Sequence, residues 1–267
     1  MRSQPDHADS TRVSPYTVRE LSAGVDEDVA SARRHELVRL ARCVAGVPAT
    51  FRLLIGPPAT VLIGEVLRSN HDLLVRSHAR DVIAGGSTRY GAVDEELLRK
   101  CPCSVLLVAP GRTPERPRIA GTIRTRSERA VDNALSMKIV ELTLLMARLE
   151  NGAPMLLQTW VPFAEGMIRT NALDDAFAAY VEAVRHRTAG NLAHLAQSFE
   201  GSLPGVLTTS RRGEPEDVIP EFAVKEGIDL VVMAAPPNEG GLTEMLFGRP
   251  SQKLLQRLTC SLLTVRL

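Results

Sequence analysis

The sequence has few aromatic residues, no marked excess of one charge and no long apolar runs. It has one Trp, three Tyr and six Phe in 267 residues, so any core must be mainly aliphatic. Its 32 basic and 31 acidic residues nearly cancel, which disfavours a nucleic-acid groove. No apolar run has membrane-spanning length, and the polar first 24 residues do not form a signal-peptide pattern. We therefore expect a cytoplasmic globular protein with no nucleic-acid or membrane partner.

Cysteine is scarce as well. No second pair of Cys or His stands at ligand spacing from Cys101 and Cys103, which disfavours a metal site. Without a secretory signal, reduced thiols are the expected state. We predict that the cysteines serve as small buried apolar side chains. The four are Cys43, Cys101, Cys103 and Cys260.

What the sequence does contain is an internal repeat with a constant shift of 157 residues, as from Gly56 to Gly213 and from Asp72 to Asp229. Between residues 56 and 108, 13 of 53 positions are identical to their counterparts in the second half. The identities fall on turns, strand starts and helix cores, without a gap. This distribution indicates a duplication.

The second copy of the repeat alternates strand and helix patterns. Runs rich in Val, Ile and Leu predict strands, and apolar residues at helical spacing predict helices. The alternation predicts an α/β fold, with a parallel, doubly wound sheet and helices on both faces. The predicted strands are 118–125, 154–161, 205–210, 229–234 and 260–267, and the predicted helices are 128–151, 173–199, 213–228 and 249–258.

The first copy is shorter. Counterparts of the second copy's first two strands and first helix would fall before residue 5. We therefore predict an incomplete domain at 1–111 and a complete one at 116–267. A mis-set start or a truncated gene would explain the deficit, and the alternative is that residues 1–24 are a natural, disordered replacement. The elements predicted for the first copy are helices 26–45, 58–69 and 93–100 and strands 49–55, 72–77 and 103–109.

Two segments of the second copy, GEPEDVIPEFAVKEGIDLVVMA (213–234) and LLQRLTCSLLTVRL (254–267), resemble the universal stress protein family. In the first copy, ELLRKCPCSVLLVAP (96–110) resembles the tandem branch called universal stress protein E. The resemblance implies two tandem units of the adenine nucleotide alpha hydrolase type. It also implies a cytoplasmic protein tied to stress resistance, including survival of DNA damage, without an established catalytic reaction.

The same resemblance implies how such units associate. The two domains of a tandem member pair through their last strands, which here are Val105–Ala109 and Ser261–Leu267. The expected partner is therefore the protein itself, as a pseudo-dimer within one chain or as a homodimer.

Many family members bind ATP through Gly-x2-Gly-x9-Gly-Ser/Thr after the fourth strand, with an Asp ending the first strand. This sequence departs from that pattern. Ala234–Pro237 (AAPP) stands at the first glycines, and Pro236 and Pro237 have no N–H for a phosphate. Gly248 is kept, but Arg249 replaces the hydroxyl residue and Arg124 stands where the Asp would be. We expect no cofactor, and the alternative is ATP binding with slow hydrolysis.

The first copy departs from the motif too, with Ser77–Arg80 at the glycine positions and Ala92 after Gly91. Two interpretations of Arg124 and Arg249 stay open. Their guanidinium groups converge on a small anionic ligand, or they are surface arginines that serve no ligand, which is the commoner case. No catalytic or metal-binding set is predicted. The candidate ligand-binding residues are Arg124, Ala234, Gly248 and Arg249.

Overall fold

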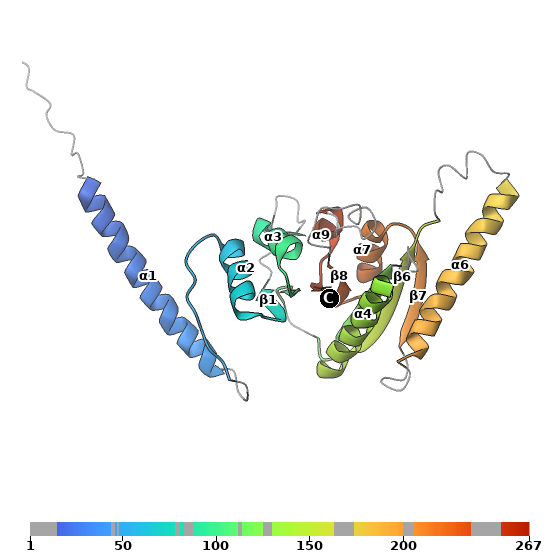
Figure 1. Ribbon diagram of the computed structural model, residues 1–267, viewed down its shortest axis with the longest axis horizontal. Helices are drawn as coiled ribbons and strands as arrows, with labels where there is room; N and C mark the ends of the chain where they lie inside the picture. Colours follow the sequence, from blue (N-terminus) through green and yellow to red (C-terminus); the bar gives the residue numbers. More distant parts are fainter. Residues whose placement is uncertain are drawn as a thin grey trace, which may run out of the picture. The chain divides into compact units, whose positions relative to one another are not determined.

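The computed structural model describes residues 15–43, 46, 48–77, 81–82, 88–111, 114–124, 130–162, 174–199, 206–235 and 252–266. The chain divides into two units, residues 1–56 and residues 57–267. The first unit contains one long helix, α1 (Pro15–Cys43; Figure 1). This helix begins well before the predicted start at 26. Residues 15–24, for which the sequence left disorder as an alternative, are part of it.

The strand predicted at 49–55 is wrong, because residues 48–55 have no regular secondary structure. Its counterpart in the repeat is β7 (Leu207–Arg212), which pairs in parallel with β6 (Ala153–Trp160). No described element of the first half corresponds to β6. A strand without a neighbour leaves its backbone N–H and C=O groups unpaired, so the apolar pattern is not sufficient to form one.

The second unit is built on a seven-stranded sheet in the order β1-β4-β9-β8-β5-β6-β7. Neighbouring strands are parallel except β4 and β9, which are antiparallel. The α/β prediction is confirmed, with the difference that the sheet is mixed at this one junction. A separate two-stranded antiparallel sheet is formed by β2 (Asp81–Val82) and β3 (Thr88–Arg89). The remaining strands are β1 (Leu73–Ser77), β4 (Ser104–Val108), β5 (Arg118–Arg124), β8 (Leu230–Ala234) and β9 (Ser261–Val265).

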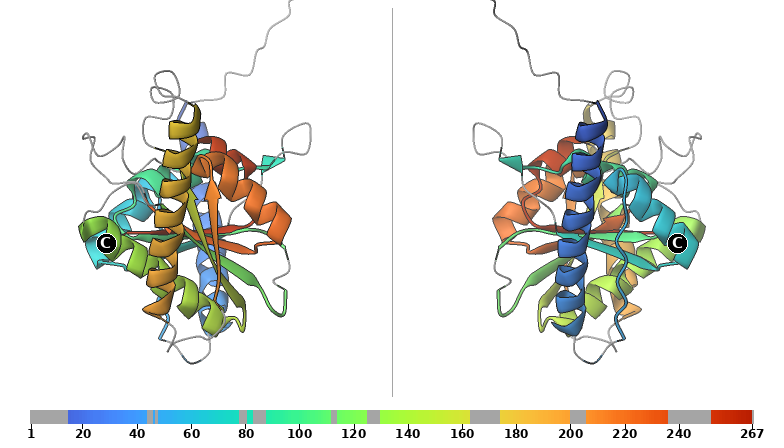
Figure 2. Two further views of the ribbon diagram at one scale, coloured as in Figure 1. Left: turned by 90° about the vertical axis from the view of Figure 1, so that its right-hand side faces the viewer. Right: turned by 90° about the vertical axis from the view of Figure 1, so that its left-hand side faces the viewer.

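Helices lie on both faces of this sheet, as in a doubly wound fold. On one face, α2, α3, α7 and α9 enclose the largest cluster of buried side chains. On the other, α4 and α6 pack over β5, β6, β8 and β9. Figure 1 shows α6 and α7 flanking β6 and β7, and in the left view of Figure 2 β7 runs between them. The helices are α2 (Pro58–Ser69), α3 (Ala92–Lys100), α4 (Ala130–Leu149), α6 (Asp174–Gln197), α7 (Pro215–Glu226) and α9 (Gln252–Arg257).

The repeat is visible in the boundaries of these elements. The bounds of α2, β1 and β4 differ from those of α7, β8 and β9 by the same 157 residues. The turns agree as well: Gly56 and Gly213 have φ of 138° and 139°. Helices α2 and α7 end in left-handed caps at Asn70 and Gly227, with φ of 50° and 60°. These are residue types that tolerate positive φ.

The antiparallel junction between β4 and β9 relates the two halves by a local twofold axis. It is centred on Leu106 opposite Leu263, which are counterparts in the repeat. Ser104, the first residue of β4, accepts with its Oγ a hydrogen bond of 3.2 Å from the N–H of Arg266, the residue after β9. Ser261, the first residue of β9, accepts one of 3.0 Å from the N–H of Ala109, the residue after β4. Reciprocal contacts of this kind are those that a symmetric pair of duplicated units would make.

Three of the four cysteines are buried as predicted, and the fourth is not. Cys101, Cys103 and Cys260 lie in the core, whereas Cys43, the last residue of α1, is exposed. The Sγ atoms of Cys101 and Cys103 are 3.5 Å apart. Burial, followed by the hydrogen bond with Cys101, raises the pKa of Cys103 to about 12.

This difference in burial predicts the reactivity of the thiols. At pH 8, iodoacetamide should alkylate Cys43 in the native protein and leave Cys103 unmodified, because a thiol of pKa about 12 is almost entirely protonated. Peptide mass spectrometry checks this, with the urea-denatured protein as the control in which all four cysteines react. Native labelling of Cys103 at the rate of Cys43 would contradict it.

Candidate functional site

The carboxyl ends of β5 and β8 form the sheet edge at which the candidate ligand residues were predicted. These strands are parallel neighbours, with Ile119 opposite Leu230 and Gly121 opposite Val232. Their last residues, Arg124 and Ala234, therefore lie at the same edge of the sheet. The structure thus brings two of the four predicted residues together. Gly248, Arg249 and the side chain of Arg124 lie outside the described residues.

The position of β5 depends on a close approach between strand and helix. A Cβ atom on Gly121 would lie 2.4 Å from Oγ1 of Thr143 in α4, far inside contact distance. That hydroxyl donates a hydrogen bond of 2.7 Å to the carbonyl of Ile139 one turn earlier, so it is held in place. The absence of a side chain at Gly121 therefore lets α4 settle against β5, the strand that ends in Arg124.

The first three positions after β8 offer no free backbone donor to a phosphate. The N–H of Ala235 donates to the carbonyl of Val265 in β9, at 2.8 Å. The next two residues, Pro236 and Pro237, have no N–H at all. Three successive positions at the end of the strand are therefore without a free amide. A phosphate cradle is made of such amides, and residues 236–251, which continue this segment, lie outside the described residues.

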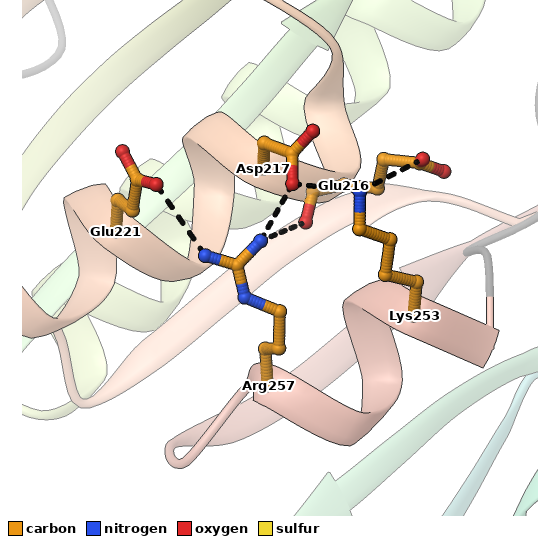
Figure 3. A network of polar contacts seen from close by, with 5 residues as sticks. All are labelled: Glu216, Asp217, Glu221, Lys253 and Arg257. Atoms are coloured by element: carbon orange, nitrogen blue, oxygen red, sulfur yellow. Dashed lines mark hydrogen bonds and ion pairs between the residues drawn. The ribbon is translucent and has the colours of Figure 1, made fainter.

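The cations of α9 are engaged by carboxylates of α7 (Figure 3). Lys253 Nζ lies 2.9 Å from Asp217 Oδ1 and 3.5 Å from a Glu216 carboxylate oxygen. Arg257 pairs with Asp217 at 2.6 Å and with Glu221 at 3.4 Å. The hydrogen bond from Lys253 lowers the pKa of Asp217 and raises the pKa of Lys253 itself. These two cations therefore serve to join α9 to α7 rather than to form an unopposed anion site.

The corresponding edge of the first half is occupied by a carboxylate. Asp94, in the first turn of α3, is 1% exposed and forms an ion pair with Arg76 of β1. Its Oδ2 also accepts the N–H of Gly91, at 3.3 Å. Gly91 is the counterpart of Gly248 in the repeat, and its amide is engaged by the carboxylate of Asp94.

Sequence reasoning missed this Asp94 contact. A signal was present, because an acidic residue at the third position of a helix often caps the N-terminus. Its cationic partner was not foreseeable, since Arg76 lies on a different element. Among the described residues, no group of three or more His, Cys, Asp or Glu side chains could hold a metal ion. Within the same residues, no helix is long and apolar enough to span a membrane.

Known proteins similar to this chain point to one family. The model of the Universal stress protein family matches residues 125–266. Universal stress protein E of Salmonella typhi is 28% identical over 224 residues, which are 83% of this chain and 70% of that protein. Its counterpart in Photorhabdus laumondii is 27% identical over 211 residues, 78% of this chain and 66% of that protein. The chain thus spans about two thirds of the length of these relatives.

Solved structures agree on the fold. A Pseudomonas aeruginosa UCBPP-PA14 protein described as a universal stress protein superposes with a TM-score of 0.62 at 18% identity, covering 88% of this chain and 77% of that one. At this level of identity the similarity concerns the architecture alone. The shared architecture is the doubly wound sheet with helices on both faces.

Proposed function

Because the chain belongs to the universal stress protein family, we propose that it is a non-catalytic, cytoplasmic stress-response protein that acts by binding a ligand or a partner. The similarity to universal stress protein E supports a role in stress, and we propose that this role includes survival of DNA damage. The proposal assigns no reaction to the sheet edge formed by β5 and β8. It gives that edge, at most, a small anionic ligand near Arg124 and Arg249.

The shortage of free backbone amides is the observation on which the proposed loss of ATP binding rests. The amide of Ala235 is bonded within the sheet, and Pro236 and Pro237 supply none. In the first half, the amide of Gly91 is bonded to the Asp94 carboxylate, whose negative charge also opposes a phosphate at that helix terminus. Each half therefore lacks backbone donors at a position where the family motif has them.

We expect ATP with Mg²⁺ to leave the melting temperature of the protein unchanged and to release no phosphate above the buffer control. A nucleotide present at 100 times its Kd would stabilise the fold by about 2.7 kcal/mol, which a thermal scan resolves easily. The small-anion site is tested by the same thermal scan with pyrophosphate, on the protein and on the double variant Arg124→Ala/Arg249→Ala. A clear rise in melting temperature with ATP, accompanied by slow phosphate release, would replace this proposal with the ATP-binding alternative.

A further inference from the structure

Two buried thiols lie side by side at the end of α3. Cys101 is the C-cap residue of this helix, and Cys103 directly precedes β4, the strand that pairs with β9 across the two halves. Their Sγ atoms are 3.5 Å apart, a distance at which one thiol can donate to the other. The bond between the sulfurs of a disulfide is about 2.05 Å long, so a small movement of the two side chains separates this dithiol from a disulfide.

The repeat shows that packing alone does not require a cysteine at position 101. The counterpart of Cys101 is Leu258, which follows α9 and is 2% exposed, so a leucine fills the equivalent place in the second half. Cys103, in contrast, has another cysteine, Cys260, as its counterpart. A cysteine before the last strand is therefore common to both halves, whereas the pair of thiols is particular to the first.

A cation accompanies the additional thiol. Arg266, the residue after β9, donates from its guanidinium to two carbonyls in the last turn of α3, both at 3.1 Å. Burial lowers the pKa of Arg266, and negative charge on Cys101 and Cys103 raises it, so the guanidinium is close enough to interact with both sulfurs. The counterpart of Arg266 is Ala109. The guanidinium and the pair of thiols thus occur together in one half, where the other half has alanine and leucine.

We propose that Cys101 and Cys103 form a reversible disulfide, with hydrogen peroxide as the oxidant. The sulfur of Cys101 attacks the peroxide, so that an S–O bond forms, the O–O bond breaks and the first water leaves with the thiol proton. The sulfur of Cys103 then attacks the sulfenic acid at Cys101. The S–S bond forms, the S–O bond breaks, and the hydroxyl leaves as a second water with the proton of Cys103. The two electrons that the thiols lose reduce one peroxide to two waters.

The surroundings of the pair give each sulfur its role. Burial, followed by the hydrogen bond with Cys101, raises the pKa of Cys103 to about 12, so Cys103 keeps its proton and Cys101 reacts first. The guanidinium of Arg266 stabilises a thiolate beside it, which is the nucleophilic form of cysteine. Cys101 is 0% exposed and Cys103 is 8% exposed, so the pair suits an oxidant little larger than water. Disulfides of this kind in a reducing compartment are transient and sense oxidants.

The test treats the full chain carrying Cys43→Ser, which removes the exposed thiol, with hydrogen peroxide under native conditions. The product is denatured, alkylated with N-ethylmaleimide and mapped by mass spectrometry. We expect Cys101 and Cys103 to escape alkylation as a disulfide that dithiothreitol reverses, and Cys260 to be alkylated. In the matched control Cys101→Leu, which copies Leu258, no disulfide should form and Cys103 should be alkylated.

Arg266→Gln tests the cation, because the amide can still donate to the carbonyls of α3 but carries no charge. It should slow disulfide formation by about threefold or more, and an unchanged or higher rate would overturn the role of Arg266. The disulfide itself is ruled out if Cys101 and Cys103 stay open to alkylation at a peroxide dose that oxidises Cys43 in the unmodified chain. Oxidation of either sulfur to a sulfinic acid without an S–S bond would rule it out as well. None of these residues belongs to the edge of β5 and β8, so this inference and the proposed function can fail separately.

Discussion

Asp94→Ser is expected to lower the free energy of unfolding by about 2–3 kcal/mol. The side chain of Asp94 is 1% exposed, pairs with Arg76 and caps α3 through the N–H of Gly91. Removing one partner of a fully buried ion pair typically costs about 3–5 kcal/mol, because it leaves the other charge uncompensated. The value here is smaller, since the Arg76 side chain is 29% exposed and can be partly hydrated. Urea denaturation followed by circular dichroism measures it.

The second half supplies the control for this experiment. At the positions equivalent to Arg76 and Asp94 it has Met233 and Ser251, an apolar and a small residue in place of the ion pair. The double variant Arg76→Met/Asp94→Ser should therefore recover most of the stability that Asp94→Ser loses. If the double variant is as unstable as the single one, the loss comes from the cap or from packing, and the ion pair is not its cause.

Gly121→Ala is expected to destabilise the protein by about 2 kcal/mol, within the range for overpacked cores. The added Cβ would lie 2.4 Å from Thr143 Oγ1 and 3.1 Å from Leu156 Cδ2, so α4 would have to move away from β5. Fluorescence of Trp160, the only tryptophan and a buried residue of β6, reports the unfolding of this part of the sheet.

A double-mutant cycle isolates the cause. In a Thr143→Ala background the nearest atom is gone, and the next atom of that side chain, its Cβ, lies at 3.3 Å. Gly121→Ala should then cost much less than in the unmodified protein, which gives a favourable coupling between the two substitutions. If Gly121→Ala lowers the free energy of unfolding equally in the two backgrounds, the contact with Thr143 does not set the distance between α4 and β5.

Part of the candidate site could be predicted from the sequence, because some properties of its residues depend on covalent structure alone. Pro236 and Pro237 lack an N–H in any fold, so their unsuitability for a phosphate cradle needed no coordinates. The hydrogen bond that engages the Ala235 amide could not be predicted in this way. It depends on Val265, a residue of the last strand, which enters the sheet beside β8.

The ends of the elements are a property of local sequence. Pro58 and Pro215 suit the first turn of a helix, and Asn70 and Gly227 tolerate the left-handed cap that stops one. Local patterns of this kind act over a few residues. The bounds of α2 are those predicted, and α7 is two residues shorter at each end than the predicted helix 213–228. The repeat added the expectation that the segments shared by both halves would form the same elements, and the bounds of α2, β1 and β4 do differ from those of α7, β8 and β9 by 157 residues.

Burial and pairing, by contrast, depend on what lies across the fold. Leu73 and Leu230 are the same residue in the same local sequence, yet one is exposed and the other is buried, because α4 covers a single half. The apolar run at 49–55 remains without a strand for a related reason, since backbone hydrogen bonds need a second strand to receive them. Contacts between distant segments therefore decided which repeated residues became core and which became surface.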